Sequence, residues 1–355
     1  MKEQVSGSTG FQPVTGPQIS DSASLRPVIG VEVGGTKLQV ALGTRQGKIV
    51  RLRTERACPE AGAQGIRAQI ESLVRRLLEE AGRNGPEAIG VGFGGPVDSA
   101  AGTVLVSHQV EGWSDFPLRQ WFEDHFGLPC LVENDSNAAG WAEYRCGAGR
   151  GARNMIYMNI GSGIGGAIII GGTLYNGQGR GAGEIGHTYV PNLWSTSKDE
   201  ASADKLENLC SGWAIERRLR AIGQIPEGSP LAELTGGQIE RITGPILAEA
   251  AARGDRLVLE TLNCAAQMLG VAIANVVTLF HPERFVVGGG FAQMGEPLFE
   301  RLRWAVEGHV FAPFRGRYEI LPAQLEQNVV LVGALLLAPI GYVSVLSRSG
   351  KTDQS

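Results

Sequence analysis

The sequence predicts a two-domain α/β protein, because two distant segments share one local design. VIGVEVGGTKLQVAL, from Val28 to Leu42, has the pattern of an apolar strand, a Gly-Gly turn and a second strand. MIYMNIGSGIGGAIIIGG, from Met155 to Gly172, repeats this layout. A length of 355 residues also favours two domains. Each half can bury its own core, so we expect the functional site in a cleft between the two domains.

The segments after each strand pair alternate between helical and strand patterns. Ile66–Gly82 has the apolar spacing of an amphipathic helix, and Glu87–Asp98 predicts a buried strand that runs into a turn. Leu128–Gly147 predicts a short strand that enters a helix. Arg256–Pro282 predicts a long buried helix, and Glu283–Val306 predicts a strand, a glycine turn and a helix.

The composition argues against several classes of protein. The 51 glycines, without a collagen-like period, indicate glycine-rich loops. A net charge of −4 provides no basic field for nucleic acid. The five cysteines are odd in number and form no C-x-x-C or C-x-C pair, which argues against a disulfide framework and a cysteine-rich zinc site. We therefore expect reduced thiols in a cytoplasmic protein.

The two ends of the chain differ from the rest. Residues 1–27 are rich in Ser, Gly, Gln and Pro, which predicts a disordered tail, and they lack the pattern of a signal peptide. Val329–Leu346 is apolar and about as long as the shortest membrane spans. Because Pro339 interrupts it, we predict a buried strand followed by a core helix, and no membrane association.

Glycine-rich loops are the first candidate binding elements. Gly161–Gly166 fits the pattern G-x-G-x-x-G, but the apolar run AIII predicts a strand after it, whereas a dinucleotide fold needs a helix there. A glycine hairpin instead lets backbone N–H groups approach phosphate oxygens closely. One such loop alone favours an ordinary β-turn. The turn after Val33 and a third glycine run, Gly288–Gly290, shift the balance toward a nucleotide site.

Two further stretches leave alternatives open. VENDSNAAG places Asn134 and Asp135 at a strand-to-helix junction, which suits either a helix cap or a general base that faces a cleft. Between Gly181 and Gly212, the side chains of Glu, His and Cys fit a metal site, an acid–base site, a sugar clamp or a surface loop.

Seven motifs together resemble the ROK family of bacterial sugar kinases and repressors. They occur in the family's order and spacing: VIGVEVGGTK, GVGFGGPVD, VENDSNAA, NIGSGIGGAIIIGG, GAGEIGH, ENLCSG and VVGGG. The resemblance implies the actin-like ATPase fold, also called ribonuclease H-like, which is a duplicated two-domain α/β fold with an interdomain cleft. It divides the chain into the tail 1–27, an N-terminal domain 28–137, a C-terminal domain 138–338, and a last segment 339–355.

The resemblance also implies roles for individual residues. Asn134 and Asp135 bind the sugar, Asp135 is the general base, and Glu184, His187 and Glu207 complete a sugar clamp. The nucleotide contacts fall on the first phosphate loop Gly34, Gly35, Thr36 and Lys37, the second phosphate loop Gly161, Ser162, Gly163, Gly165 and Gly166, and the adenosine border Gly288 and Gly289.

The implied reaction is ATP-dependent phosphorylation of a hexose, with glucose as the default substrate and Mg²⁺ as the metal. Phosphoryl transfer suits such a site because it needs positioning and charge neutralisation more than covalent help. Fructose and N-acetylhexosamines are the alternative substrates, and a sugar-sensing protein without turnover is the alternative class. The family's repressors carry a winged-helix domain ahead of the first phosphate loop, which residues 1–27 do not match, so we expect no nucleic-acid partner. A homodimer or homotetramer is implied.

Three departures from the family pattern affect the site. Glu32 stands where many members carry Asp, and we expect it to hold Mg²⁺ through water. Gln109 replaces a usual Asn, and a glycine of GFGGP replaces a common proline, so the resemblance leaves the exact sugar open. The stretch after GEIGH lacks the family's C-x-C-x4-C zinc cluster.

We therefore expect no structural zinc, since zinc takes four Cys or His ligands and His187 with Cys210 supplies two at most. Cys210 is then a packing residue. Either packing around Trp194 and Leu206 replaces the metal, or loop 195–205 becomes ordered only when sugar binds.

Overall fold

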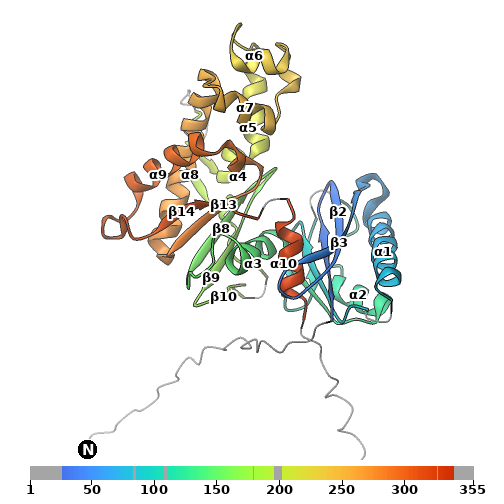
Figure 1. Ribbon diagram of the computed structural model, residues 1–355. Coiled ribbons are helices and arrows are strands. Elements are labelled where there is room, and N and C mark those ends of the chain that lie inside the picture. Colours follow the sequence, from blue (N-terminus) through green and yellow to red (C-terminus); the bar gives the residue numbers. More distant parts are fainter. Residues whose placement is uncertain are drawn as a thin grey trace, which may run out of the picture.

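The computed structural model describes residues 26–82, 85–107, 110–178, 180–195, 202–325 and 327–339. Figure 1 shows two lobes, one built around β1–β3 with α1 and α2, and the other around β8–β10 with α5–α9. The predictions for most of the N-terminal tail, for Gln109 and for the centre of loop 195–205 lie outside the described residues.

The N-terminal sheet has the strand order β3-β2-β1-β4-β7. The pairs β1–β2 and β2–β3 are antiparallel, whereas β1–β4 and β4–β7 are parallel. The bounds are β1 Val28–Val33, β2 Lys37–Gly43, β3 Ile49–Arg56, β4 Ile89–Phe93 and β7 Cys130–Asn134.

The C-terminal sheet repeats this plan with the order β10-β9-β8-β13-β14. Its pairs β8–β9 and β9–β10 are antiparallel, and β8–β13 and β13–β14 are parallel. The bounds are β8 Met155–Ile160, β9 Ile164–Ile170, β10 Thr173–Leu174, β13 Arg284–Gly288 and β14 Glu319–Pro322. The same order and the same strand directions in both sheets confirm the predicted duplication.

The two faces of the N-terminal sheet pack against different helices. Because side chains alternate along a strand, Ile29 and Val31 face one side, where they share a buried core with Ile66 and Ile70. Those two residues belong to α1 (Gly62–Ala81), which lies beside α2 (Leu118–Phe126) on the outer side of this lobe (Figure 1).

The other face of the N-terminal sheet carries α10 (Val329–Leu337) from near the end of the chain. Gly30 and Gly90 are paired neighbours on β1 and β4. A methyl group at Gly30 would lie 3.0 Å from the carbonyl oxygen of Leu331, and one at Gly90 would overlap that of Ala334. The glycines thus allow the helix backbone to lie directly on the sheet.

The position of α10 corrects two predictions. The helix belongs to the N-terminal lobe, so assigning all of residues 138–338 to the C-terminal domain was wrong for this part. Residues 329–337 also form one helix rather than a buried strand followed by a helix. A short, fully apolar run has no periodicity that separates the two possibilities.

Helix α3 (Asp135–Cys146) joins the two lobes. A methyl group at Gly140 would overlap the side chain of Ala167 on β9, so α3 packs closely on the C-terminal sheet. A methyl group at Gly333 of α10 would overlap the carbonyl oxygen of Ala138, so α3 also touches α10. The predicted domain boundary at residue 137 therefore falls inside this helix, whose first residue is a candidate site residue.

The core of the C-terminal lobe is built around α8 (Arg256–Phe280), the long buried helix that the sequence predicts. Within the described ranges, it alone is long and apolar enough to cross a membrane, with a mean hydropathy of 1.6. Leu262, Leu269 and Ile273 are fully buried in the core, which accounts for this apolar composition.

Shorter elements complete the lobes. The remaining helices are α4 Leu206–Cys210, α5 Gly212–Ala221, α6 Pro230–Thr235, α7 Gly244–Ala252 and α9 Glu296–His309. The short strand pairs are β5 Val97–Asp98 with β6 Thr103–Val104, and β11 Tyr189–Pro191 with β12 Ala203–Lys205. The single 3₁₀ turns are η1 Pro59–Ala61, η3 Ile185–His187, η4 Ile239–Arg241, η5 Gly290–Met294 and η6 Ala312–Phe314.

Candidate active site

The first glycine turn connects β1 to β2 and is tight. The N–H of Gly34 donates to the carbonyl oxygen of Lys37 over 3.0 Å, so the turn consists of Gly34, Gly35, Thr36 and Lys37. The N–H of Ala57 holds the turn from outside by donating to the carbonyl oxygen of Thr36. Both glycines are half-buried and Thr36 is exposed, which leaves backbone donors within reach of a ligand.

Glu32 and Lys37 form an ion pair at the base of this turn, with Oε1 and Nζ 3.1 Å apart. Lys37 Nζ also donates to the carbonyl oxygen of Gln327. Glu32 Oε2 is buried and has no hydrogen-bond partner among the described residues. Burial raises the pKa of Glu32, Lys37 opposes that rise, and the charge of Asp135 adds to it. The carboxylate of Asp135 thus lies close enough to interact with that of Glu32.

Asn134 caps α3, as one of the two open interpretations predicts. Its Oδ1 accepts hydrogen bonds from the N–H groups of Ser136 and Asn137 at 2.9 and 3.1 Å. Its Nδ2 donates to the carbonyl oxygen of Gly95. These bonds fix the side chain of Asn134 at the junction between β7 and α3.

Asp135 is the first residue of α3, and its Oδ2 lies near the first glycine turn. Its Oδ1 accepts from the N–H of Ser136 at 2.7 Å. A methyl group at Gly94 would lie 3.5 Å from Asp135 Oδ2 and 3.6 Å from the Cα of Gly34. Burial raises the pKa of Asp135 to about 6, the bonds from Ser136 oppose the rise, and the charge of Glu184 adds to it. Such a carboxylate suits a general base near neutral pH.

The residue before these two, Glu133, anchors the junction, and the sequence analysis missed it. It is buried, and its Oε1 accepts from Ser99 Oγ, the N–H of Asn134 and Asn137 Nδ2. Its Oε2 accepts from Asn176 Nδ2 at 2.8 Å. The sequence signal for Glu133 was a charged residue within an apolar strand. A carboxylate buried there needs several hydrogen-bond donors, which predicts a structural polar network.

The second glycine turn is formed by Gly161, Ser162 and Gly163 between β8 and β9. Gly165 and Gly166, which were predicted to belong to the same phosphate loop, lie within β9, directly after the turn. A methyl group at Gly165 would overlap Ser136 Oγ, and one at Gly166 would lie 2.6 Å from the carbonyl oxygen of Gly183. These two glycines therefore let α3 and the GAGEIGH segment pack onto the strand.

Glu207 ties the predicted clamp to the second glycine turn. Its Oε2 accepts a hydrogen bond of 2.7 Å from the N–H of Ile164, the first residue of β9. Gly212 N–H donates to the carbonyl oxygen of Gly161 at 2.8 Å, so the chain on the far side of α4 is held to the same turn. One carboxylate oxygen of Glu207 is thus fixed at the start of β9.

Glu184 and His187 lie at the two ends of the 3₁₀ turn η3, and both are exposed. A methyl group at Gly186 would overlap the carbonyl oxygen of Ile164, so this turn also packs on the start of β9. The clamp residues and the first turn of α3 thus meet around the same few residues of β9.

Lys205 contacts His187 across a short strand pair. Tyr189 pairs with Lys205 in the β11–β12 ladder, and Lys205 Nζ lies 3.4 Å from His187 Nδ1. An ammonium group has only donors, so it fixes Nδ1 as the acceptor and leaves Nε2 to carry the ring proton. The sequence analysis named His187 but not Lys205.

A cavity of about 360 Å³ opens beside the second glycine turn. Its walls include the apolar side chains of Trp213, Ile215, Phe291 and Met294 together with Gly161, Ser162, Gly212, Glu216, Gly244, Pro245, Leu247, Gly290 and Gln293. This mixture of flat apolar and polar groups suits a nucleoside.

Gly288 and Gly289 were predicted to border this site, but the residues that line it come directly after them. A methyl group at either glycine would overlap β8, at Tyr157 Oη for Gly288 and at the carbonyl oxygen of Ile160 for Gly289. The two glycines therefore pack behind the cavity.

The described residues contain no group of three or more His, Cys, Asp or Glu side chains arranged to hold a metal ion. Cys210 is fully buried in the core of the C-terminal lobe, and its thiol lies near the carbonyl oxygen of Ala265. Cys210 is therefore a packing residue, as expected. Trp194 also packs against this core and donates from its indole nitrogen to the carbonyl oxygen of Leu209.

Comparison with known proteins gives consistent results. A family model described as the ROK family matches residues 28–340. A glucokinase of Streptomyces coelicolor is 33% identical over 320 residues, which cover 87% of this chain and 96% of the relative. A xylose repressor of Caldicellulosiruptor bescii is 25% identical, with 87% of this chain and 77% of the relative covered.

A solved structure of a ROK family protein is also similar to this chain. A ROK family glucokinase from Streptomyces griseus, in complex with glucose and AMPPNP, matches with a TM-score of 0.74 and 33% identity, over 88% of this chain and 99% of that one. The match confirms the predicted fold.

Proposed function

The chain belongs to the ROK family, and we propose that it is an ATP-dependent kinase that phosphorylates glucose at its 6-hydroxyl. One observation carries the proposal. Asp135, with a pKa raised to about 6, lies near the first glycine turn, and a nucleoside-sized cavity opens at the second glycine turn. A base and two candidate phosphate-binding turns are the parts that phosphoryl transfer to a hydroxyl requires.

In this proposal Asp135 accepts the proton of the sugar hydroxyl that attacks the terminal phosphate of ATP. Asn134 binds the sugar through its side-chain amide, and its cap bonds hold it in place. Glu184, His187 and Glu207 bind the other hydroxyls, because carboxylates accept hydrogen bonds and imidazole can donate one. The backbone N–H groups of the two glycine turns bind phosphate oxygens.

Mg²⁺ fits the same region. Glu32 Oε2 is buried without a partner, and the carboxylate of Asp135 lies close enough to raise the pKa of Glu32 further. Two neighbouring carboxylates favour a divalent cation, and Mg²⁺ in kinase sites is held largely by water and phosphate oxygens. In this proposal Glu32 would hold Mg²⁺ through water, and the bound ion would supply positive charge for the phosphate oxygens.

The sugar is the least determined part of the proposal. The exposed positions of Glu184 and His187 do not by themselves select among glucose, fructose and N-acetylhexosamines. Full-length similarity to a glucokinase supports glucose. A sugar-sensing protein without turnover is the competing class, which similarity to a repressor supports and the placement of Asp135 opposes.

An assay for ADP release over a panel of sugars tests these possibilities. We expect glucose to give the highest kcat/KM, with fructose, N-acetylglucosamine and N-acetylmannosamine below it. A different best sugar corrects the substrate. If every sugar leaves ATP turnover at the background of an Asp135→Asn variant, the kinase proposal fails and sugar binding without turnover remains.

Lys205→Met tests whether Lys205 positions His187 for the sugar. The change removes the ammonium group but keeps a long apolar side chain, so the tautomer of His187 is no longer fixed. We expect the KM for the sugar to rise by about two- to fivefold with kcat little changed, since exposed polar contacts contribute modestly. Steady-state kinetics check this, with the exposed Lys48→Met as the control. An unchanged KM contradicts a positioning role.

The proposal extends to assembly and location. Leu279, Phe280 and Phe311 are 78%, 39% and 52% exposed, and the N–H of Phe311 donates to Thr278 Oγ1, so these apolar side chains share one surface. Such a patch favours a homo-oligomer, a dimer or a tetramer. We also propose a cytoplasmic enzyme without a nucleic-acid or membrane partner. Light scattering of the purified protein tests the assembly, and a monomer at micromolar concentration contradicts it.

A further inference from the structure

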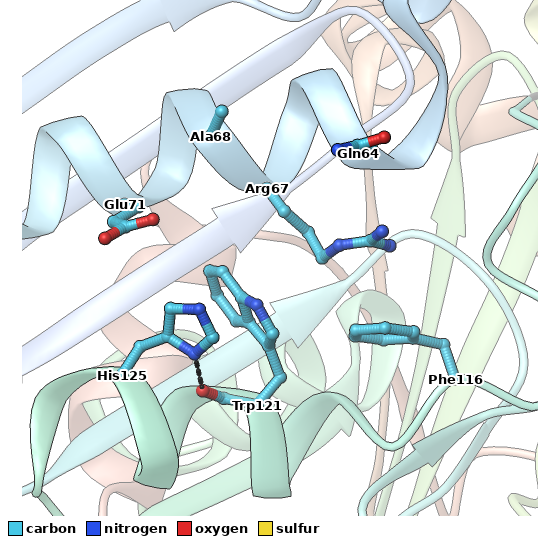
Figure 2. A pocket seen from close by; sticks show the side chains of 7 residues that line it. All are labelled: Gln64, Arg67, Ala68, Glu71, Phe116, Trp121 and His125. Carbon is cyan, nitrogen blue, oxygen red and sulfur yellow. Dashed lines mark hydrogen bonds between the residues drawn. The ribbon is translucent and has the colours of Figure 1, made fainter.

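A second cavity, of about 390 Å³, lies between α1 and α2 on the outer side of the N-terminal lobe. Figure 2 shows the side chains that line it, which come from α1, from α2 and from the segment before α2. None of them belongs to the candidate active site. The volume falls in the range of small-molecule sites, roughly 300–1,000 Å³.

Arg67 of α1 provides an unpaired cation at one end of this cavity. Its guanidinium carbon lies 4.3 Å from the ring centre of Phe116 and 5.3 Å from that of Trp113. Within the described part of the chain it makes no ion pair, and its Nη1 is buried without a hydrogen-bond partner. Burial lowers the pKa of Arg67, although an arginine stays charged.

The contacts with the rings of Phe116 and Trp113 do not satisfy the N–H donors of Arg67. A cation–π contact uses the face of the guanidinium plane, whereas the N–H donors point outward from its edge. Glu71, one turn further along α1, forms its ion pair with Arg75 at 2.7 Å and none with Arg67. In Figure 2 the carboxylate of Glu71 and the guanidinium of Arg67 lie at opposite ends, with Trp121 between them. An anion is therefore the complement that Arg67 lacks.

The other groups around the cavity suit a hydroxylated ring. Trp121 is half-buried and presents an indole surface on which a ring can stack. Gln64 offers an amide, and Glu71 Oε2 is an acceptor for hydroxyl groups. His125 Nδ1 lies 2.8 Å from the carbonyl oxygen of Trp121, so Nδ1 carries the proton and Nε2 is free for a ligand. An aromatic anion would leave these polar groups unmatched.

We propose that the α1–α2 cavity binds a hexose phosphate, with the phosphate on the edge of Arg67 and the sugar ring over Trp121. Arginine pairs with phosphate through two parallel hydrogen bonds, which suits a guanidinium whose donors are unused. The role of this ligand as the enzyme's own product rests on the proposed function, since the proposed reaction forms a hexose phosphate. Binding itself does not depend on turnover.

Isothermal titration with glucose 6-phosphate tests the proposal on the full chain, in the presence of saturating glucose and AMPPNP to fill the active site. We expect one binding event that weakens by about tenfold to a hundredfold in Arg67→Met, since a charge-assisted contact is lost. Arg76→Met, an exposed position on the same helix, is the matched control and should bind as the wild type does. Inorganic phosphate and phenyl phosphate should bind more weakly than glucose 6-phosphate.

Hydrogen exchange of the wild type provides a readout that needs no variant. Glucose 6-phosphate should protect amides in residues 64–71 and 116–125, whether or not the protein proves to be a kinase. The proposal is overturned if glucose 6-phosphate gives no such protection, or if Arg67→Met binds it as tightly as the wild type. Equal affinity for inorganic phosphate or phenyl phosphate overturns the sugar part of the assignment.

Discussion

Replacing Asp135 by Asn is expected to lower kcat for glucose phosphorylation by about 10²- to 10⁴-fold, the usual contribution of a positioned general base. An amide has nearly the same shape, and its oxygen can still accept the bond from Ser136 N–H, but it cannot take a proton. The KM for glucose should change little. Coupled ADP-release kinetics measure both constants, with Asp124→Asn on exposed α2 as the control.

The same variant should keep or gain stability, which separates lost chemistry from lost folding. Since the pKa of Asp135 in the folded protein is raised to about 6, its charged form is disfavoured in the folded state. The stability that its protonated form contributes is present below the unfolded pKa of about 4 and is lost as the pH rises through 6. Above pH 6, Asp135→Asn should therefore melt at the same or a higher temperature than the wild type. A lower melting temperature indicates that the carboxylate is structural.

The pH dependence of the wild-type kcat/KM, which reports the ionisation of the free enzyme, gives a third check on Asp135. Activity should fall by about tenfold per pH unit below a midpoint near 6, because the base becomes protonated there. A midpoint near the ordinary value of an aspartic acid, about 4, contradicts the assigned environment.

The parts of the site that the sequence predicted are those set by local chemistry. Gly34 and Gly161 each follow an apolar strand and precede another, and no other residue pattern explains such tight turns. Asn134 and Asp135 also lie where the strand-to-helix junction places them. The observed helix cap is compatible with the proposed general base, because the amide of Asn134 caps α3 while Asp135 Oδ2 lies near the turn.

The errors arise where one residue type serves several purposes. Glycine forms turns, permits close approach and adopts positive φ, and the sequence does not say which of these applies. Gly165 and Gly288 were assigned to a ligand for their lack of a side chain, and that same lack lets Ser136 and Tyr157 pack against them. The lining of the nucleoside-sized cavity was missed for another reason. Trp213 and Phe291 lie far apart in the chain, and only the tertiary fold brings them to one cavity.

The position of α10 is the clearest case of a feature outside the reach of local patterns. The chain returns to the N-terminal sheet after crossing the whole C-terminal lobe, and an apolar helix fits either core. The sequence signal for this contact was Gly30 on β1 with Gly90 and Gly92 on β4, which remove three side chains from one face of the sheet. A strand with glycine on one face and large apolar residues on the other predicts close backbone contact on the glycine face.

Gly90→Ala is therefore expected to destabilise the N-terminal lobe by about 3 kcal/mol or more, at the upper end of overpacking effects. The added methyl group would overlap the carbonyl oxygen of Ala334 and lie 3.1 Å from the N–H nitrogen of Ala338. Both are backbone atoms of the end of α10, so no rotamer change relieves the contact. The helix must lift away, and Leu331 and Leu335, both fully buried, lose packing.

Urea unfolding, followed by hydrogen exchange in β1, β4 and α10, measures this effect lobe by lobe, since a two-lobed protein need not unfold in one step. Gly308→Ala in α9 is the matched control. No atom lies within 4 Å of the added methyl group there, and a helical alanine should stabilise by about 1 kcal/mol instead. If Gly90→Ala unfolds at the same urea concentration as the wild type, α10 does not lie on the glycine face. Because α10 also contacts α3 through Gly333 and Ala138, the displaced helix should carry Asp135 with it, and kcat should fall even where the C-terminal lobe stays folded.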